Sequence, residues 1–177
     1  GIHAKVRRAG LNLPYDLPVV RFLTEPMLKI GTVQINNSFY NQSYFPYSIG
    51  VLQAFAQRYL KERDDFVFLP PVYSMIPVQE AAAKLLEADI ACFSVYVWNE
   101  RFSLKLAEML KRERPEMVVV FGGPQVPDRE SEKFLRLNPF VDIACHGEGE
   151  RVFLSILENY NRRDWLEVPS ISYLDKK

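Results

Sequence analysis

The sequence predicts an α/β fold of the Rossmann-like, doubly wound kind: a five-stranded parallel sheet with helices on both faces. Apolar runs alternate with amphipathic helical segments from Met27 onward, and such alternation is typical of a parallel sheet. The run at 90–98 (IACFSVYVW) is almost continuously hydrophobic, as expected for a central strand covered on both faces. The length of 177 residues suits one such domain, since domains usually span about 100–200 residues.

The first half of the chain contains two expected strands and two expected helices. In chain order these are a strand at 28–35, a helix at 48–61, a strand at 66–69 and a helix at 78–87. The first helix has one apolar face, made by four side chains at helical spacing: Ile49, Leu52, Phe55 and Tyr59. The strand at 66–69 ends at two prolines, which cannot donate hydrogen bonds to a neighbouring strand. A polar and aromatic loop at 36–47 joins the first strand to the first helix.

The second half continues the alternation. It contains expected strands at 90–98, 117–121 and 141–145, and expected helices at 100–113, 129–137 and 150–160. Asn99 is expected to be the N-cap of the helix at 100–113, and Pro115 ends that helix. Residues 165–177 are expected to form a short extended segment or half of a hairpin.

The chain divides into three expected regions. Residues 1–26 contain four basic residues and three prolines and sustain no helical or strand period. They are interpreted either as a leader or as an N-terminal arm that packs on the domain through the run VVRFL. The α/β domain is expected at 27–160, and residues 161–177 follow it.

Composition and motifs exclude several function classes. Lys plus Arg and Asp plus Glu both total 22, and this balance argues against nucleic acid as the main partner. The two cysteines, Cys92 and Cys145, are too few for a disulfide framework or an iron–sulfur cluster, and as reduced core residues they suit a cytoplasmic protein. No apolar run reaches the ~20 residues that a membrane-spanning helix needs. The phosphate-binding GxxxxGK[ST], the dinucleotide-binding GxGxxG and the nucleophile motif GxSxG are all missing.

Ligands of doubly wound sheets bind outside the carboxyl ends of the strands, which draws attention to the loops at 36–47, 97–101, 122–128 and 146–150. Gly122 and Gly123 either let a ligand approach the backbone or make a turn that needs positive φ. The hydroxyl of Ser94 bonds either to backbone or to a ligand tail inserted between strands. His146 is either a donor to a ligand or a structural residue. Five aromatic residues of the first loop are candidates to line a binding site for a flat ligand: Phe39, Tyr40, Tyr44, Phe45 and Tyr47.

Four motifs together resemble the cobalamin-binding domain at the N-terminus of B12-dependent radical SAM enzymes. They are LKIGTVQI with the following FPYSIGVLQAF, then ADIACFSVYVWN, VVVFGGPQVP and VDIACHGEGE. The resemblance implies that the corrin ring of cobalamin lies across the strand ends and that its nucleotide tail is buried in the domain. The resemblance implies five cofactor-binding residues: Ser94, Gly122, Gly123, Gly147 and Glu148. The other candidates are given by position: Tyr96, Trp98 and Asn99 at the tip of the strand at 90–98, Pro124 and Gln125 after the glycine pair, and His146.

The chain departs from the wider B12 family in lacking the motif DxHxxG, whose histidine ligates cobalt. Cobalamin is therefore expected to bind base-off, without a histidine ligand, and no protein metal ligand is expected. The alternative is an interaction module of the same fold that has lost cobalamin. A free-standing enzyme that uses His146, Glu148 and Glu150 as acid and base is a third reading.

A second departure is that the radical SAM motif CxxxCxxC does not occur in the chain. S-adenosylmethionine and a [4Fe-4S] cluster are therefore expected only in an absent barrel domain, toward which residues 161–177 would start a linker. No catalytic residue and no catalysis are expected from this chain alone. The parent protein is expected to be a radical SAM enzyme, with methyl transfer as the leading reaction.

Overall fold

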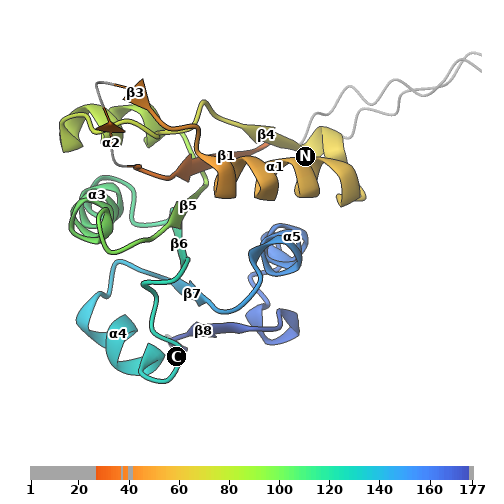
Figure 1. Ribbon diagram of the computed structural model, residues 1–177. Coiled ribbons are helices and arrows are strands. Elements are labelled where there is room, and N and C mark those ends of the chain that lie inside the picture. Colours follow the sequence, from red (N-terminus) through yellow and green to blue (C-terminus); the bar gives the residue numbers. More distant parts are fainter. Residues whose placement is uncertain (1–26, 37, 40–41, 176–177) are drawn as a thin grey trace, which may run out of the picture.

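The computed structural model describes residues 27–175, apart from residues 37, 40 and 41. Residues 1–26, expected as a leader or arm, lie outside the described residues. Within the described part, the strands of the main sheet follow the order β4-β1-β5-β6-β7-β8 (Figure 1). The bounds are β1 Leu28–Val33, β4 Phe66–Phe68, β5 Ile90–Ser94, β6 Val118–Gly122, β7 Ile143–Cys145 and β8 Ile171–Tyr173.

The predicted Rossmann-like α/β fold is confirmed. The first five strands of this order are parallel, and β8 joins the edge antiparallel to β7. The sheet therefore has one strand more than the predicted five, because the segment expected to be extended pairs with β7. Two short strands, β2 Ser38–Phe39 and β3 Gln42–Ser43, pair antiparallel in the loop between β1 and the first helix.

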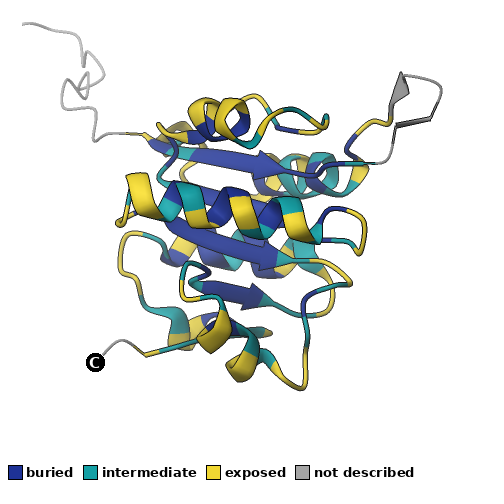
Figure 2. Ribbon diagram, turned by 90° about the vertical axis from the view of Figure 1, so that its left-hand side faces the viewer, coloured by how far each residue is buried: buried dark blue, intermediate teal, exposed yellow. Residues whose placement is uncertain are grey.

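Helices cover both faces of the sheet. Their bounds are α1 Tyr47–Tyr59, α2 Val78–Leu85, α3 Glu100–Glu113, α4 Ser131–Leu137 and α5 Gly149–Asn159, with short 3-10 turns at Arg63–Asp65 and Trp165–Glu167. Helices α1 and α5 lie on one face, and α2, α3 and α4 lie on the other (Figure 1). The strands between these layers are buried, while the outer sides of the helices are exposed (Figure 2). No helix among the described residues is both long and apolar enough to span a membrane.

Strand side chains on the α1/α5 face form rows that run across the sheet. Ile30, Ile90 and Val118 are paired in register and form a row near the amino ends of the strands. The next rows, toward the carboxyl ends, contain smaller side chains: Thr32, Cys92 and Val120, and then Ser94 and Gly122. Because this face loses side-chain volume toward the carboxyl edge, α1 and α5 cannot fill the space there.

Two details of the central strand differ from the prediction. Strand β5 ends at Ser94, and residues 95–98, which were predicted to continue it, leave the strand and enter a turn at 97–99. Asn99 occupies the N-cap position of α3 but makes no side-chain capping bond. Instead, the side-chain NH₂ of Asn99 donates to the backbone carbonyls of Ile35 at 2.9 Å and Ser94 at 3.0 Å. Its side-chain oxygen Oδ1 accepts from the backbone N–H of Tyr96 at 2.9 Å. Asn99 thus holds the turn that ends the strand.

Candidate functional site

A cavity of about 310 Å³ lies between the sheet and the first turns of α1 and α5, at the carboxyl edge. Its floor comes from the α1/α5 face of four strands: Thr32, Cys92, Ser94, Val120, Gly122 and Cys145. Its walls come from the two helices: Ser48, Val51, Leu52, Gly149 and Phe153. The volume lies at the small end of the range for ligand pockets, which is about 300–1,000 Å³.

The cavity exists because side chains on the floor are small and the helices still approach each other. A Cβ atom on Gly122 would lie 3.5 Å from the Cβ of Cys145, an ordinary contact, so this glycine leaves room without being required by sterics. A Cβ atom on Gly149 would lie 3.1 Å from Leu52, so the glycine lets the start of α5 come close to α1. The space is therefore enclosed by packed elements and is open toward the carboxyl edge.

Two hydroxyl groups on the floor have no protein partner. Thr32 and Ser94 are buried, and neither hydroxyl makes a hydrogen bond to another described residue. Neither oxygen is fully buried, and both residues line the cavity, so water or a ligand there can supply the missing bond. The floor thus offers two hydrogen-bonding groups to an occupant.

The two cysteines on the floor of the cavity carry no charge at neutral pH. Burial raises the pKa of the Cys145 thiol to about 12, and burial, followed by the nearby Cys145, raises the pKa of the Cys92 thiol well above its usual value. Both thiols therefore remain protonated at neutral pH and act as small apolar groups rather than as nucleophiles. Among the described residues, no three His, Cys, Asp or Glu side chains gather into a possible metal site.

Two of the aromatic side chains at this edge, Tyr47 and Tyr96, line the cavity. Tyr96 shares a hydrogen bond of 2.8 Å with the hydroxyl of Ser48 and stacks on Trp98, with ring centroids 4.7 Å apart and an angle of 7° between the planes. The indole N–H of Trp98 donates to the carbonyl of Ile35 at 3.1 Å, which fixes the stacked pair. Tyr44, Phe45 and Tyr47 are more than half exposed at the start of α1. The carboxyl edge thus presents flat apolar surface beside a narrow cavity.

The structure brings only some of the predicted binding residues to the cavity. Those that line it are Ser94, Tyr96, Gly122, Gly123 and Gly147. Those that do not line it are Trp98, Asn99, Pro124, Gln125, His146 and Glu148. The side-chain amide of Gln125 instead donates to the Glu100 carboxylate at 3.2 Å, and Trp98 lies beside the mouth through its stacking on Tyr96.

His146 is directed away from the cavity. It follows Cys145 in the chain, and neighbouring strand residues point to opposite faces. Its Nε2 lies 2.9 Å from the hydroxyl of Ser172, which in turn donates to Ser131, and its Nδ1 lies 3.7 Å from the Asp128 carboxylate. His146 therefore joins β7 to β8 and α4 and does not face the cavity.

Five residues that line the cavity were not predicted to bind the cofactor: Thr32, Cys92 and Cys145 on the floor, and Leu52 and Phe153 on the walls. The signal was present in the strands, because two-residue alternation places Thr32 and Cys92 on the same face as Ser94 and Gly122 once the register is known. Leu52 and Phe153 are apolar residues at helical spacing, and nothing in a single sequence separates a cavity wall from a core.

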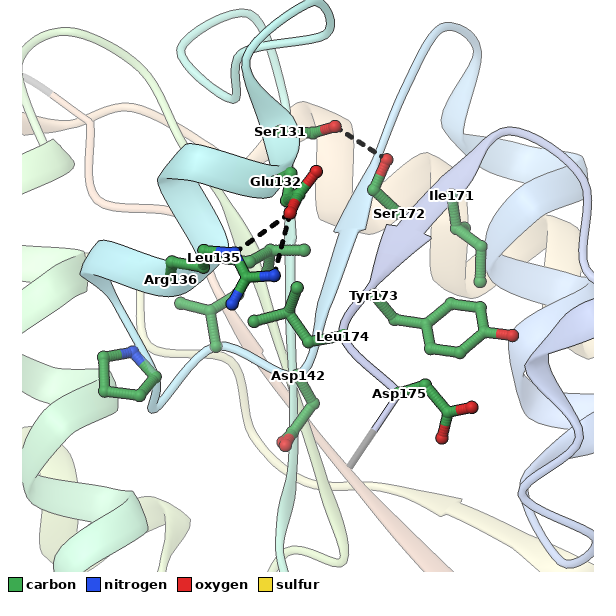
Figure 3. Close-up of a pocket in the computed structure, with 12 residues that line it drawn as sticks. Ser131, Glu132, Leu135, Arg136, Asp142, Ile171, Ser172, Tyr173, Leu174 and Asp175 are labelled. Carbon is green, nitrogen blue, oxygen red and sulfur yellow. Dashed lines mark hydrogen bonds and ion pairs between the residues drawn. The ribbon is translucent and has the colours of Figure 1, made fainter. Parts of the chain in front are cut away.

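A larger groove of about 670 Å³ lies between α4 and β8, on the far edge of the sheet (Figure 3). Several of its polar side chains are already partnered: Arg136 donates two hydrogen bonds to the Glu132 carboxylate, and Ser131 accepts from Ser172. Arg136 and Glu132 are also mostly exposed, and exposed ion pairs contribute little binding energy. This groove is less suited to hold a cofactor than the cavity at the carboxyl edge.

Replacing Gly123 by alanine is expected to lower the free energy of unfolding by about 1–3 kcal/mol, because a residue with a Cβ is strained at positive φ. Gly123 has φ +109°, and its Cβ would lie 2.6 Å from the carbonyl oxygen and 2.9 Å from the nitrogen of Val95, both backbone atoms. Urea denaturation measures the change. The matched control is Gly122→Ala, whose Cβ meets only an ordinary contact and which should change stability little. Equal destabilisation by the two variants would contradict the claim that position 123 specifically requires glycine.

A family model and two curated relatives match the chain. The model of the B12 binding domain family matches residues 54–157, more than half of the chain. Two curated relatives are each 37% identical over 131 residues, which is 73% of this chain and 19% of the relative. One is the cobalamin-dependent radical SAM methyltransferase TokK of Streptomyces tokunonensis, and the other is the 2-(S-pantetheinyl)-carbapenam-3-carboxylate methyltransferase of Streptantibioticus cattleyicolor. The chain thus spans about a fifth of the length of these relatives.

A solved structure shares the fold. The cobalamin-dependent S-adenosylmethionine radical enzyme OxsB, with aqua-cobalamin and S-adenosylmethionine bound, superposes with a TM-score of 0.66 at 17% sequence identity. The match covers 85% of this chain and 21% of that one. The form of OxsB without cofactors gives a TM-score of 0.64.

Proposed function

The chain belongs to the family of B12 binding domains, and from this premise we propose that it holds cobalamin as the cofactor-binding module of a radical SAM enzyme. The observation that carries the proposal is the cavity between α1, α5 and the carboxyl ends of the strands. Its size suits the nucleotide tail of cobalamin and is far too small for the corrin ring. The ring would therefore remain outside, at the edge where the aromatic side chains are exposed.

The residues of the cavity suit a nucleotide tail. The free hydroxyls of Thr32 and Ser94 can bond to polar atoms of the tail, and the apolar walls can cover its planar base. Gly122 and Gly123 keep side-chain atoms away from the path between the cavity and the ring. Gly147, with φ +69° and no atom within 4 Å of where its Cβ would be, leaves the adjacent rim open.

We propose that cobalamin binds base-off and without a histidine ligand. A tail held in the cavity is withdrawn from cobalt, and the imidazole of His146 is bonded to Ser172, away from the cavity. The amide of Asn99 already makes three hydrogen bonds, so it is not free to reach the ring. Of the candidates for the lower face, the stacked rings of Tyr96 and Trp98 remain, and they offer aromatic surface instead of a nitrogen ligand.

Bound cobalamin would supply a cobalt centre that carries a methyl group. The two curated relatives are named as methyltransferases, so we propose that this module serves a methyltransferase whose radical SAM domain lies outside the chain. That domain would hold S-adenosylmethionine and the [4Fe-4S] cluster. The exposed edge with Tyr44, Phe45 and Trp98 is the surface we propose to face it. An interaction module without cobalamin is the alternative, and the unpartnered hydroxyls inside the cavity favour the cofactor.

We expect the chain to retain cobalamin with a base-off spectrum. The test mixes the protein with hydroxocobalamin, removes free cofactor by gel filtration and records the visible spectrum. His146→Ala should leave that spectrum unchanged, because this side chain faces away from the cavity. A nitrogen-ligated spectrum that becomes base-off in His146→Ala would contradict the proposed ligation, and failure to retain corrin would favour the interaction module.

A further inference from the structure

We propose that the cavity selects among cobamides by their lower base: it accepts an apolar benzimidazole and disfavours adenine. This inference rests on the proposed function and names the class of cofactor that the same site takes. It follows from the small number of hydrogen-bonding groups inside the cavity compared with the polar atoms that each base would bury.

The cavity walls are largely apolar. Leu52, Val120 and Phe153 line it, and the two protonated thiols add weakly polar surface that neither strongly donates nor strongly accepts. Such walls stabilise the methylated ring of a benzimidazole through burial of apolar surface. They offer nothing to the edge of a purine.

The cavity contains few polar groups. The hydroxyls of Ser48 and Tyr96 bond to each other, which leaves the buried Thr32 and Ser94 to offer free hydroxyls. Tyr47 also lines the cavity, but this side chain is 73% exposed. Glu150 also lines the cavity, in the first turn of α5. Its carboxylate can accept a hydrogen bond from an amino group, but it cannot donate one to a ring nitrogen. A benzimidazole withdrawn from cobalt has a single ring nitrogen to satisfy, which one hydroxyl can do.

Adenine needs more hydrogen-bond partners than these groups provide. Compared with benzimidazole it adds an amino group and further ring nitrogens, and the ring nitrogens need donors. A buried polar atom left without a partner weakens binding by roughly a factor of ten. We therefore expect cobalamin to bind at least about tenfold more tightly than the adenine-containing cobamide.

The experiment measures dissociation constants by equilibrium dialysis for three corrinoids: cobalamin, the cobamide with adenine as lower base, and cobinamide, which lacks the nucleotide. Tighter binding of cobalamin than of either other corrinoid supports the inference. Equal affinities for cobalamin and the adenine cobamide would overturn the inference while leaving the proposed function intact. Cobinamide that binds as tightly as cobalamin would also overturn the inference, because the nucleotide tail would then contribute nothing to the affinity. No binding of any corrinoid would overturn the proposed function itself.

A pair of variants separates hydrogen bonding from shape. Cys145→Ser is nearly isosteric and places a strong donor and acceptor on the cavity floor, so it should narrow the preference for cobalamin over the adenine cobamide severalfold. Cys145→Ala removes the thiol without adding a polar group and should not narrow it. The preference is a ratio measured on one protein sample, so a general loss of stability does not mimic the effect. An unchanged ratio in Cys145→Ser together with a narrowed ratio in Cys145→Ala would contradict the account.

Discussion

Replacing Gly122 by valine is expected to weaken cobalamin binding by about a hundredfold, because a larger side chain in a closely packed site forces neighbouring groups to move. Gly122 lies on the cavity floor beside Ser94, and its new side chain would occupy space that we assign to the nucleotide tail. The fold should persist, since a Cβ at this position meets only the Cβ of Cys145, at 3.5 Å, and β-branched residues suit strands. Titration of the variant with hydroxocobalamin measures the loss.

The control for this prediction is Ser94→Ala, which removes a hydroxyl and leaves the cavity open. It should weaken binding only about tenfold, the usual effect of one hydrogen bond. Far-UV circular dichroism shows whether both variants retain the fold. If a folded Gly122→Val variant binds cobalamin as tightly as the parent protein, the nucleotide tail does not occupy this cavity.

The largest expected effect on stability is that of Asn99→Ala, at about 2–4 kcal/mol, because three hydrogen bonds are lost and their backbone partners become unsatisfied. The side chain is 1% exposed, and its bonds to Ile35, Ser94 and Tyr96 join the end of β1 to the end of β5. The same bonds shape the turn that carries the Tyr96–Trp98 stack, so the variant should also bind cobalamin less tightly. Urea denaturation measures the stability change.

Asn138→Ala is the matched control, since its amide makes one bond, to the carbonyl of Phe134 at 2.8 Å. It should cost about 1 kcal/mol or less. Equal destabilisation by the two variants would contradict the special role of Asn99.

The fold was predictable because apolar periodicity is a local property. Each parallel strand and each helix leaves its own pattern, and their alternation limits the architecture to a doubly wound sheet. The end of β5 was not predictable in the same way. Residues 95–98 are apolar enough to continue the strand, but the side chain of Asn99 holds a turn there through its bonds to Ile35, Ser94 and Tyr96.

The site was predictable where it depends on backbone position. Ser94 and Gly122 lie at the carboxyl ends of neighbouring strands, and any parallel sheet brings such residues together. His146 and Asn99 lie in the expected loops, but their side chains are held by Ser172 and Ile35, which are distant in sequence. Side-chain direction in a loop depends on such partners, which explains why some of the residues predicted to bind the cofactor do not line the cavity.

The central claim is that the cofactor tail enters the cavity between α1 and α5. Chemical-shift mapping on ¹⁵N-labelled protein titrated with hydroxocobalamin tests it most directly. We predict that the amide signals of Thr32, Ser94, Gly122 and Gly149 shift, while those of Ser131 and Tyr173 in the groove between α4 and β8 do not. Shifts confined to that groove, or no shifts at saturating cofactor, would contradict the claim.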